Sequence, residues 1–119
     1  EIILELHGSG VVEGVPLAQR CIGPVALGDE PLLIGLRHQP ELHQSAVKAA
    51  CLGSVWRDHF CVAHSGGEFW LLCLSPSPIY RVRNESCKEL ARDDLVPLLP
   101  GDRIEIAGSD GCEALCWDF

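Results

Sequence analysis

Apolar residues along this chain gather in short runs that glycine, proline and polar turns separate. Glu1–His7 is apolar and β-branched up to Gly8, and Arg103–Ala107 alternates polar and apolar positions as a half-buried strand does. Short runs divided by frequent turns are typical of a β-sandwich. The expected strands are Glu1–His7, Leu17–Leu27, Leu32–Leu36, His59–His64, Phe69–Leu74, Ile79–Arg83, Leu95–Leu99, Arg103–Ala107 and Glu113–Phe119.

Two segments modify this all-β pattern. Gly23 and Pro24 interrupt the second run, which indicates an edge strand or a bulge. Between positions 40 and 52, apolar residues recur at helical spacing, Pro40 opens the segment and Gly53 follows it. We therefore expect an all-β, two-sheet, mostly antiparallel sandwich with one short inserted helix near 40–52. The residues expected to be buried include Leu33, Ile34, Val62, Leu72, Val82, Ile104 and Ile106.

Length and composition fit one folded domain. The chain has 119 residues, of which 47% are hydrophobic, so it can bury a core and is not a disordered segment. Its first residue is Glu1 rather than methionine. We expect a single domain that spans residues 1–119 and that was cut from a longer protein.

The charge balance narrows the class of partner. Nine basic and 17 acidic residues give a formal charge of −8, whereas a nucleic-acid-binding surface needs clustered positive charge. The same negative field opposes docking on anionic membranes, and no apolar run approaches the about 18 residues of a membrane span. We expect a protein or a phosphorylated peptide as partner, and neither nucleic acid nor membrane. The sequence does not define the oligomeric state.

The cysteines indicate a reducing compartment. There are seven, an odd number, and no CxxC pair occurs. Several lie inside apolar runs, where a reduced cysteine packs as a small hydrophobe. We therefore expect free thiols without disulfides and a cytoplasmic or nuclear location.

No residue pattern in the chain indicates catalysis. Neither a Gly-x-Ser-x-Gly nor a His-Glu-x-x-His motif occurs, and the one glycine-rich stretch, near Gly8, precedes no helical pattern. Cys51, His59, Cys61 and His64 resemble a metal-binding set by composition. However, Cys61 and His64 are three apart on an expected strand and so point to opposite faces. We expect no catalytic residue, no cofactor and no metal site.

Four segments follow one another in the order and spacing of a known family. They are Leu33-Ile34-Gly35, the run Ser54–Phe60 (SVWRDHF), Phe69–Ser75 followed by Pro78–Val82, and Gly101–Ile106 (GDRIEI). Together they resemble a forkhead-associated (FHA) domain, the phosphothreonine-binding β-sandwich. The resemblance runs from about Pro31 to the end of the chain, and it implies that His59 is a structural histidine that braces the loops.

The positions that contact phosphate in that family are all altered. The resemblance implies an arginine after Gly35, a serine before the Arg-x-His segment and an asparagine in the later loop. This chain has Leu36, Trp56 and either Ser77 or Pro78 there. Leucine and tryptophan offer none of the charge-assisted hydrogen bonds that a phosphate of charge about −1.5 to −2 requires. The resemblance therefore implies a degenerate phosphothreonine pocket.

Two functions remain open. The first is a non-catalytic protein–protein interaction module, and the second is a phosphothreonine-peptide reader whose rebuilt pocket uses Arg37, Ser54 and Arg57. Trp56 fits an exposed interface residue or a side chain folded into the sandwich edge equally well. Arginines such as Arg81 and Arg83 fit a solvated surface as well as an anion site. The candidate binding residues are Arg37, Ser54, Trp56, Arg57, Ser77 and Arg81.

Overall fold

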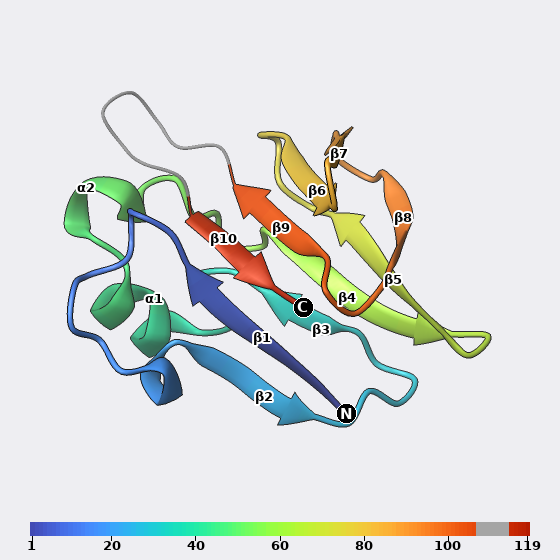
Figure 1. Ribbon diagram of the computed structural model, residues 1–119, viewed down its shortest axis with the longest axis horizontal. Coiled ribbons are helices and arrows are strands. Elements are labelled where there is room, and N and C mark those ends of the chain that lie inside the picture. The colour runs from blue at the N-terminus through green and yellow to red at the C-terminus, as the bar shows by residue number, and fades with distance from the viewer. Residues whose placement is uncertain (107–114) are drawn as a thin grey trace.

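The computed structural model describes residues 1–106 and 115–119, which fold into two facing antiparallel sheets (Figure 1). The expectation of a two-sheet β-sandwich is confirmed. The six-stranded sheet has the order β2 (Cys21–Val25), β1 (Ile2–His7), β10 (Leu115–Asp118), β9 (Arg103–Ile106), β6 (Ile79–Arg83) and β7 (Ser86–Leu90). The four-stranded sheet has the order β3 (Leu32–Ile34), β4 (Phe60–Ser65), β5 (Glu68–Cys73) and β8 (Leu95–Leu98).

The strand expected over Leu17–Leu27 forms only in the second half of that run. Its first half forms a short 3₁₀ helix over Leu17–Gln19, and its second half is β2, the terminal strand of its sheet. Pro24 lies in this edge strand, where a missing N–H donor is tolerated. The register of β1 against β2 also shifts between Ile2 and Leu4. The edge-strand alternative is therefore confirmed, and the pairing with β1 is also irregular.

The core lies between the two sheets and follows the two-residue period of the strands. On β1, Ile2, Leu4 and Leu6 are buried and the residues between them face outward. Large side chains from both sheets meet them, and each contributes roughly 1.5–3 kcal/mol by leaving water. The largest fully buried side chains include Trp117, Phe60, Ile34, Leu71, Ile79, Leu98, Ile104 and Leu115.

Three of the expected core residues are only partly buried. Ile34, Val62, Ile104 and Ile106 are buried as expected, but Leu33, Leu72 and Val82 are not. The alternation of strand side chains explains the difference. Ile34 and Leu71 take the inward positions beside Leu33 and Leu72, and Ile79 sets the inward face of β6 so that Val82 points the other way.

The helical insertion is present but is broken into two pieces. Helix α1 covers Pro40–Ala46 and helix α2 covers Ala49–Leu52. Between them Val47 is extended and pairs with Val11, while the N–H of Lys48 donates to the carbonyl of Gly10 at 2.8 Å. Valine is β-branched and has weak helix propensity, and the strand-like pairing with the N-terminal loop favours the extended conformation further. The expectation of one continuous helix over 40–52 is therefore wrong at Val47.

The insertion and the cysteines change the picture of the core. His43 of α1 is buried and packs edge-on against Trp117 of β10, with 5.5 Å between ring centroids. Cys51 of α2 is disulfide-bonded, so the expectation of a chain without disulfides is wrong. The free thiols among the described residues are Cys21, Cys61, Cys73, Cys87 and Cys116.

One expected strand extends beyond the described residues. The strand expected over 113–119 begins at Leu115 in β10, and positions 113 and 114 lie outside the described residues. Within 1–106 and 115–119, no helix is long and apolar enough to cross a membrane.

Candidate functional site

Three loops meet at one end of the sandwich, which we call the apical end. They are the loop after β3, the loop before β4 and the loop between β5 and β6. Together with the loop after β7 they enclose a hollow of about 300 Å³, which we call the apical hollow. Its lining residues are Arg37, Trp56, Arg57, Asp58, Leu74, Pro76 and Arg92.

Backbone hydrogen bonds hold the first two loops side by side. The N–H of Leu36 donates to the carbonyl of Trp56 at 2.9 Å, and the N–H of Arg37 donates to the carbonyl of Arg57 at 3.2 Å. A Cβ atom at position 35 would overlap the backbone of Arg57, so only glycine fits. The approach fixed by Gly35 places Arg37 and Arg57 next to each other, and with Leu36 they line a second hollow of about 270 Å³.

His59 braces all three loops from inside. Its ring is fully buried, and its Nδ1 accepts the N–H of Trp56 at 3.0 Å. Its backbone N–H donates to Ile34, and its carbonyl accepts the N–H groups of Leu74 and Ser75. Burial, with His43 nearby, lowers the pKa of His59 to about 4, so the ring is neutral and carries its proton on Nε2. The geometry agrees with the structural role that the family resemblance implies.

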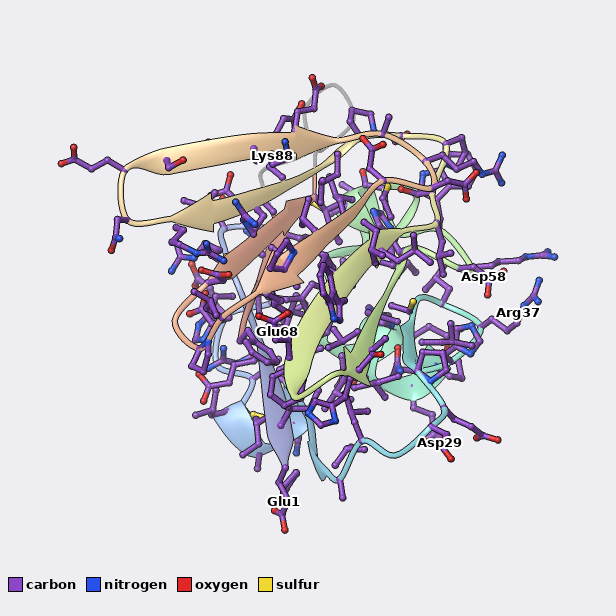
Figure 2. The ribbon with its side chains drawn as sticks, turned by 90° about the vertical axis from the view of Figure 1, so that its right-hand side faces the viewer. Glu1, Asp29, Arg37, Asp58, Glu68 and Lys88 are labelled. Carbon is purple, nitrogen blue, oxygen red and sulfur yellow. The ribbon has the colours of Figure 1, made fainter. Side chains whose placement is uncertain are left out.

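The side chains around the hollow are exposed and loosely tied. Nη2 of Arg37 lies 3.5 Å from Oδ2 of Asp58, and the other carboxylate oxygen of Asp58 accepts Nε2–H of His38 at 2.7 Å. Figure 2 shows the side chains of Arg37 and Asp58 next to each other, projecting from one side of the molecule. Trp56 is 43% exposed. Nε of Arg92 donates to the carbonyl of Leu74 at 3.3 Å.

The hollow brings together three of the six predicted site residues, Arg37, Trp56 and Arg57. Ser54 is 8% exposed and lies below the surface, so its hydroxyl does not line the hollow. Ser77 lies in the neighbouring β5–β6 loop, where its backbone carbonyl accepts Oγ–H of Ser75 at 2.6 Å. Three of the predicted residues thus line one hollow, whereas Ser54 and Ser77 are not among its lining residues.

Arg81 lies elsewhere. It is on the inward-facing side of β6, and Nη1 donates to the carbonyl of Pro97 in β8 at 2.9 Å. Its neighbour Arg83 also reaches that carbonyl, at 3.4 Å. The structure therefore places Arg81 across the gap between the sheets and not with Arg37 and Arg57.

Other lining residues were missed. Asp58 and Pro76 lie within or beside the segments that carry the family resemblance, so attention to the intervening positions could have found them. Arg92 enters the hollow from the loop between β7 and β8, which shares no motif with the other loops. Nothing in the sequence indicates its position.

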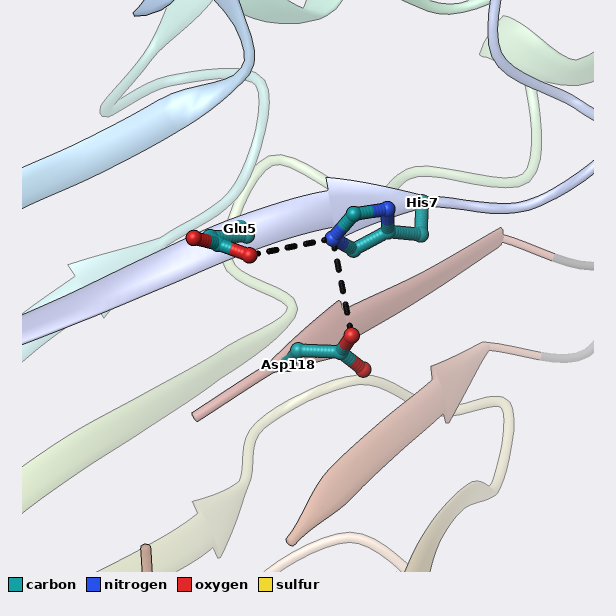
Figure 3. Close-up of side chains that lie close together, drawn as sticks. All are labelled: Glu5, His7 and Asp118. Carbon is teal, nitrogen blue, oxygen red and sulfur yellow. Dashed lines mark hydrogen bonds and ion pairs between the residues drawn. The ribbon is translucent and has the colours of Figure 1, made fainter. Parts of the chain in front are cut away.

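A second cluster of ionisable side chains lies on the outer face of the larger sheet (Figure 3). Nε2 of His7 lies 3.2 Å from Glu5 and 3.5 Å from Asp118. Nη1 of Arg20 lies 3.5 Å from Nδ1 of His7 and is held by the carbonyl of Leu6. Because arginine can only donate, Nδ1 is the accepting nitrogen and Nε2–H points at the two carboxylates.

This second cluster is therefore a hydrogen-bonded tie between β1 and β10. In this arrangement Nε2–H is donated to the carboxylates, and a metal ion bound there would have to displace that proton. Among the residues that the structure describes, no other group of three or more His, Cys, Asp or Glu side chains has ligand atoms within 4.8 Å of one another. The set Cys51, His59, Cys61 and His64 is not brought together.

Comparison with known proteins identifies the fold. No family model matches the chain, and no curated protein matches it. The N-terminal FHA domain of S. cerevisiae Rad53p, solved in complex with a phosphothreonine peptide, is similar with a TM-score of 0.58 and 11% identity over 99% of this chain and 94% of that chain. An engineered FHA domain with a Myc-pTBD peptide is similar with a TM-score of 0.58 and 13% identity over 99% and 91%. The chain therefore has an FHA-like fold, and at these identities the likeness concerns the fold alone.

Proposed function

We propose that this domain is a non-catalytic protein-interaction module that binds a partner segment in the apical hollow. The observation that carries the proposal is the exposed Trp56, flanked by Arg37 and Arg57 on loops braced by His59, with Arg92 entering the same hollow from the β7–β8 loop. Tryptophan and arginine are the residue types most enriched among those that dominate binding energy at interfaces. Loops at one end of a rigid sandwich are also the usual position for binding residues.

The lining of the hollow supports binding rather than catalysis. Its side chains are arginine, tryptophan, leucine, proline and one aspartate, and none of them is a nucleophile beside a general base. Backbone hydrogen bonds fix the loops, so a partner meets a surface that is already formed.

The altered positions argue against ordinary phosphothreonine binding. Leu36 packs against the core cluster, and Ser54 is buried. Trp56 replaces the serine that the family resemblance implies, so its position offers no hydroxyl. A partner that needs no phosphate fits this surface best.

A phosphothreonine reader with a rebuilt pocket is the second candidate. Three arginines line one hollow of a chain whose formal charge is −8, and a phosphate could be bound by Arg37, Arg57 and Arg92 together. In this pocket Arg92 would contact the phosphate in place of Ser54, the residue predicted from the sequence.

One peptide-array screen separates the two candidates. The array carries each threonine peptide in phosphorylated and unphosphorylated form, and the domain is probed alongside Trp56→Ala. We expect peptides that bind regardless of phosphorylation and lose binding with Trp56→Ala. Binding that requires phosphate would favour the reader. If no peptide depends on Trp56, the apical hollow is not the binding surface.

A further inference from the structure

The apical hollow contains one carboxylate, and it is held against the arginine that an anionic ligand would meet. Asp58 lies 3.5 Å from Nη2 of Arg37 through Oδ2. Its other oxygen accepts a 2.7 Å hydrogen bond from His38, and the N–H of His38 donates to Gly35. The carboxylate is therefore tied on both sides and points at Arg37 rather than away from it.

The two side chains that contact Asp58, Arg37 and His38, differ in their exposure to an incoming ligand. The side chain of Arg37 is 59% exposed, that of Asp58 39% and that of His38 22%. An exposed pair at 3.5 Å is weakly bound, so a ligand can compete for Arg37. The tighter contact to the less exposed His38 keeps Asp58 in the hollow while this happens.

An anion that reaches Arg37 must therefore approach a fixed negative charge. The repulsion grows in proportion to the charge of the ligand. A phosphate of charge about −1.5 to −2 is opposed nearly twice as strongly as a single carboxylate, and a neutral polar group is not opposed at all.

We propose that Asp58 is a specificity-determining internal competitor, whose carboxylate occupies Arg37 and selects partner segments with neutral or singly charged groups over phosphorylated ones. This inference rests on the proposed use of the apical hollow for binding. Asp58 is not one of the altered phosphate positions, so the selection against phosphate comes from an additional residue. Arg57 and Arg92 also line the hollow, in which Asp58 is the one acidic lining residue. These two arginines attract the partner segment.

The test compares Asp58→Asn with Asp29→Asn. The first substitution removes the charge and keeps a carbonyl oxygen that can accept from His38. The second makes the same charge change on an exposed loop residue outside the hollow, labelled in Figure 2. The probes are inorganic phosphate and acetate, followed by NMR chemical shifts of the Trp56 indole and of the Arg37 and Arg57 amides at pH 7.5.

We expect Asp58→Asn to raise the affinity for phosphate by about tenfold and that for acetate by about threefold, because like charges side by side are strongly unfavourable. Asp29→Asn should change neither by more than about twofold, because Asp29 is exposed and outside the hollow, where water and salt screen its charge. Adding Arg37→Gln to Asp58→Asn should abolish the gain, which would locate the anion at Arg37.

Three results would overturn the inference. One is no gain in phosphate affinity with Asp58→Asn, the second is an equal gain with Asp29→Asn, and the third is equal gains for phosphate and acetate. The outcome is separate from that of the proposed function. If array peptides bind through Trp56 but Asp58→Asn has none of these effects, only the inference fails. If no peptide depends on Trp56, the proposed function fails first.

Discussion

Two arginine–aspartate pairs lie at opposite ends of the molecule and differ in almost every physical respect. Arg83, the last residue of β6, holds Asp102 through two hydrogen bonds of 2.8 Å, and the N–H of Leu99 donates to the same carboxylate. Asp102 is 1% exposed. At the apical end, Arg37 and Asp58 are exposed and separated by 3.5 Å.

The difference separates a pair that stabilises the fold from a pair that is available to a ligand. Burial raises the pKa of Asp102, but the hydrogen bonds from Arg83 and Leu99 outweigh burial and hold the pKa below its usual value. Such a carboxylate cannot be given up without loss of stability. The Arg37–Asp58 pair is exposed and contributes little to stability, so it can change partners when a ligand arrives.

The largest effect is expected from breaking the buried pair. Asp102→Ala removes three hydrogen bonds to one carboxylate and should lower the free energy of unfolding by about 3 kcal/mol. Asp58→Ala, the matched change in the exposed pair, should alter it by no more than about 0.5 kcal/mol. Urea denaturation of both variants measures the contrast. Equal losses would mean that the apical pair is also a structural one.

Acid should reduce the stability that His59 gives to the apical loops, whereas the exposed Arg37–Asp58 pair has little effect on stability. His59 has a folded-state pKa of about 4 against an ordinary value of 6.5, so the unfolded chain binds a proton first as the pH falls. The stability that neutral His59 contributes is complete above pH 6.5 and is lost between pH 6.5 and about 4, up to about 3 kcal/mol. The lowered pKa of buried His43 acts in the same direction.

NMR titration of the His59 ring protons checks this expectation directly, and unfolding experiments across the same pH range give its energetic consequence. A His59 titration midpoint near 6.5 would contradict it. The Asp102 contribution has a different range, because its depressed pKa means that stability is lost only as the pH falls below the ordinary value of 3.8.

The sequence predicted the parts of the fold that repeat locally. Alternating strands, the turn residues between them and the helical composition of 40–52 each have a short-range cause, and all are present. The break at Val47 could not be predicted, because it depends on pairing with Val11 in a distant loop. Strand β7 was missed because four of its five residues are exposed, so it lacks an apolar pattern, and among the described residues it is an edge strand that pairs with β6.

The candidate site was predictable to a similar extent. The family-like segments located the loops and correctly indicated His59 as a brace. They could not show that Ser54 is buried or that Arg81 faces the other sheet, since both depend on which face of an element the chain presents. Nor could they show the disulfide at Cys51, whose presence removes the basis for inferring a reducing compartment.

Restoring the altered phosphate positions should convert the apical end toward the family's usual chemistry. Leu36→Arg together with Trp56→Ser adds two groups that can bind phosphate, each contributing roughly 1.5–3 kcal/mol when fully engaged. Incomplete alignment reduces the gain, and we expect about 2 kcal/mol, or roughly thirtyfold, in affinity for phosphothreonine peptides. Titration calorimetry measures it, with the unphosphorylated peptides as control. A wild-type domain that already binds phosphothreonine peptides at low micromolar affinity would instead support the rebuilt pocket.

The smallest expected effect distinguishes the two kinds of arginine most directly. Arg57 lines the apical hollow, whereas Arg81 donates to the carbonyl of Pro97 between the sheets. Arg57→Gln should weaken binding of an array-selected peptide by about fivefold, near 1 kcal/mol, and leave the unfolding free energy unchanged. Arg81→Gln should do the reverse, lowering that free energy by about 1 kcal/mol through its lost hydrogen bond and leaving peptide affinity unchanged. Calorimetry and urea denaturation on the same two variants test both halves. If Arg81→Gln weakened binding as much as Arg57→Gln, the binding surface would have to extend along β6, and the apical hollow would be too small a definition of the site.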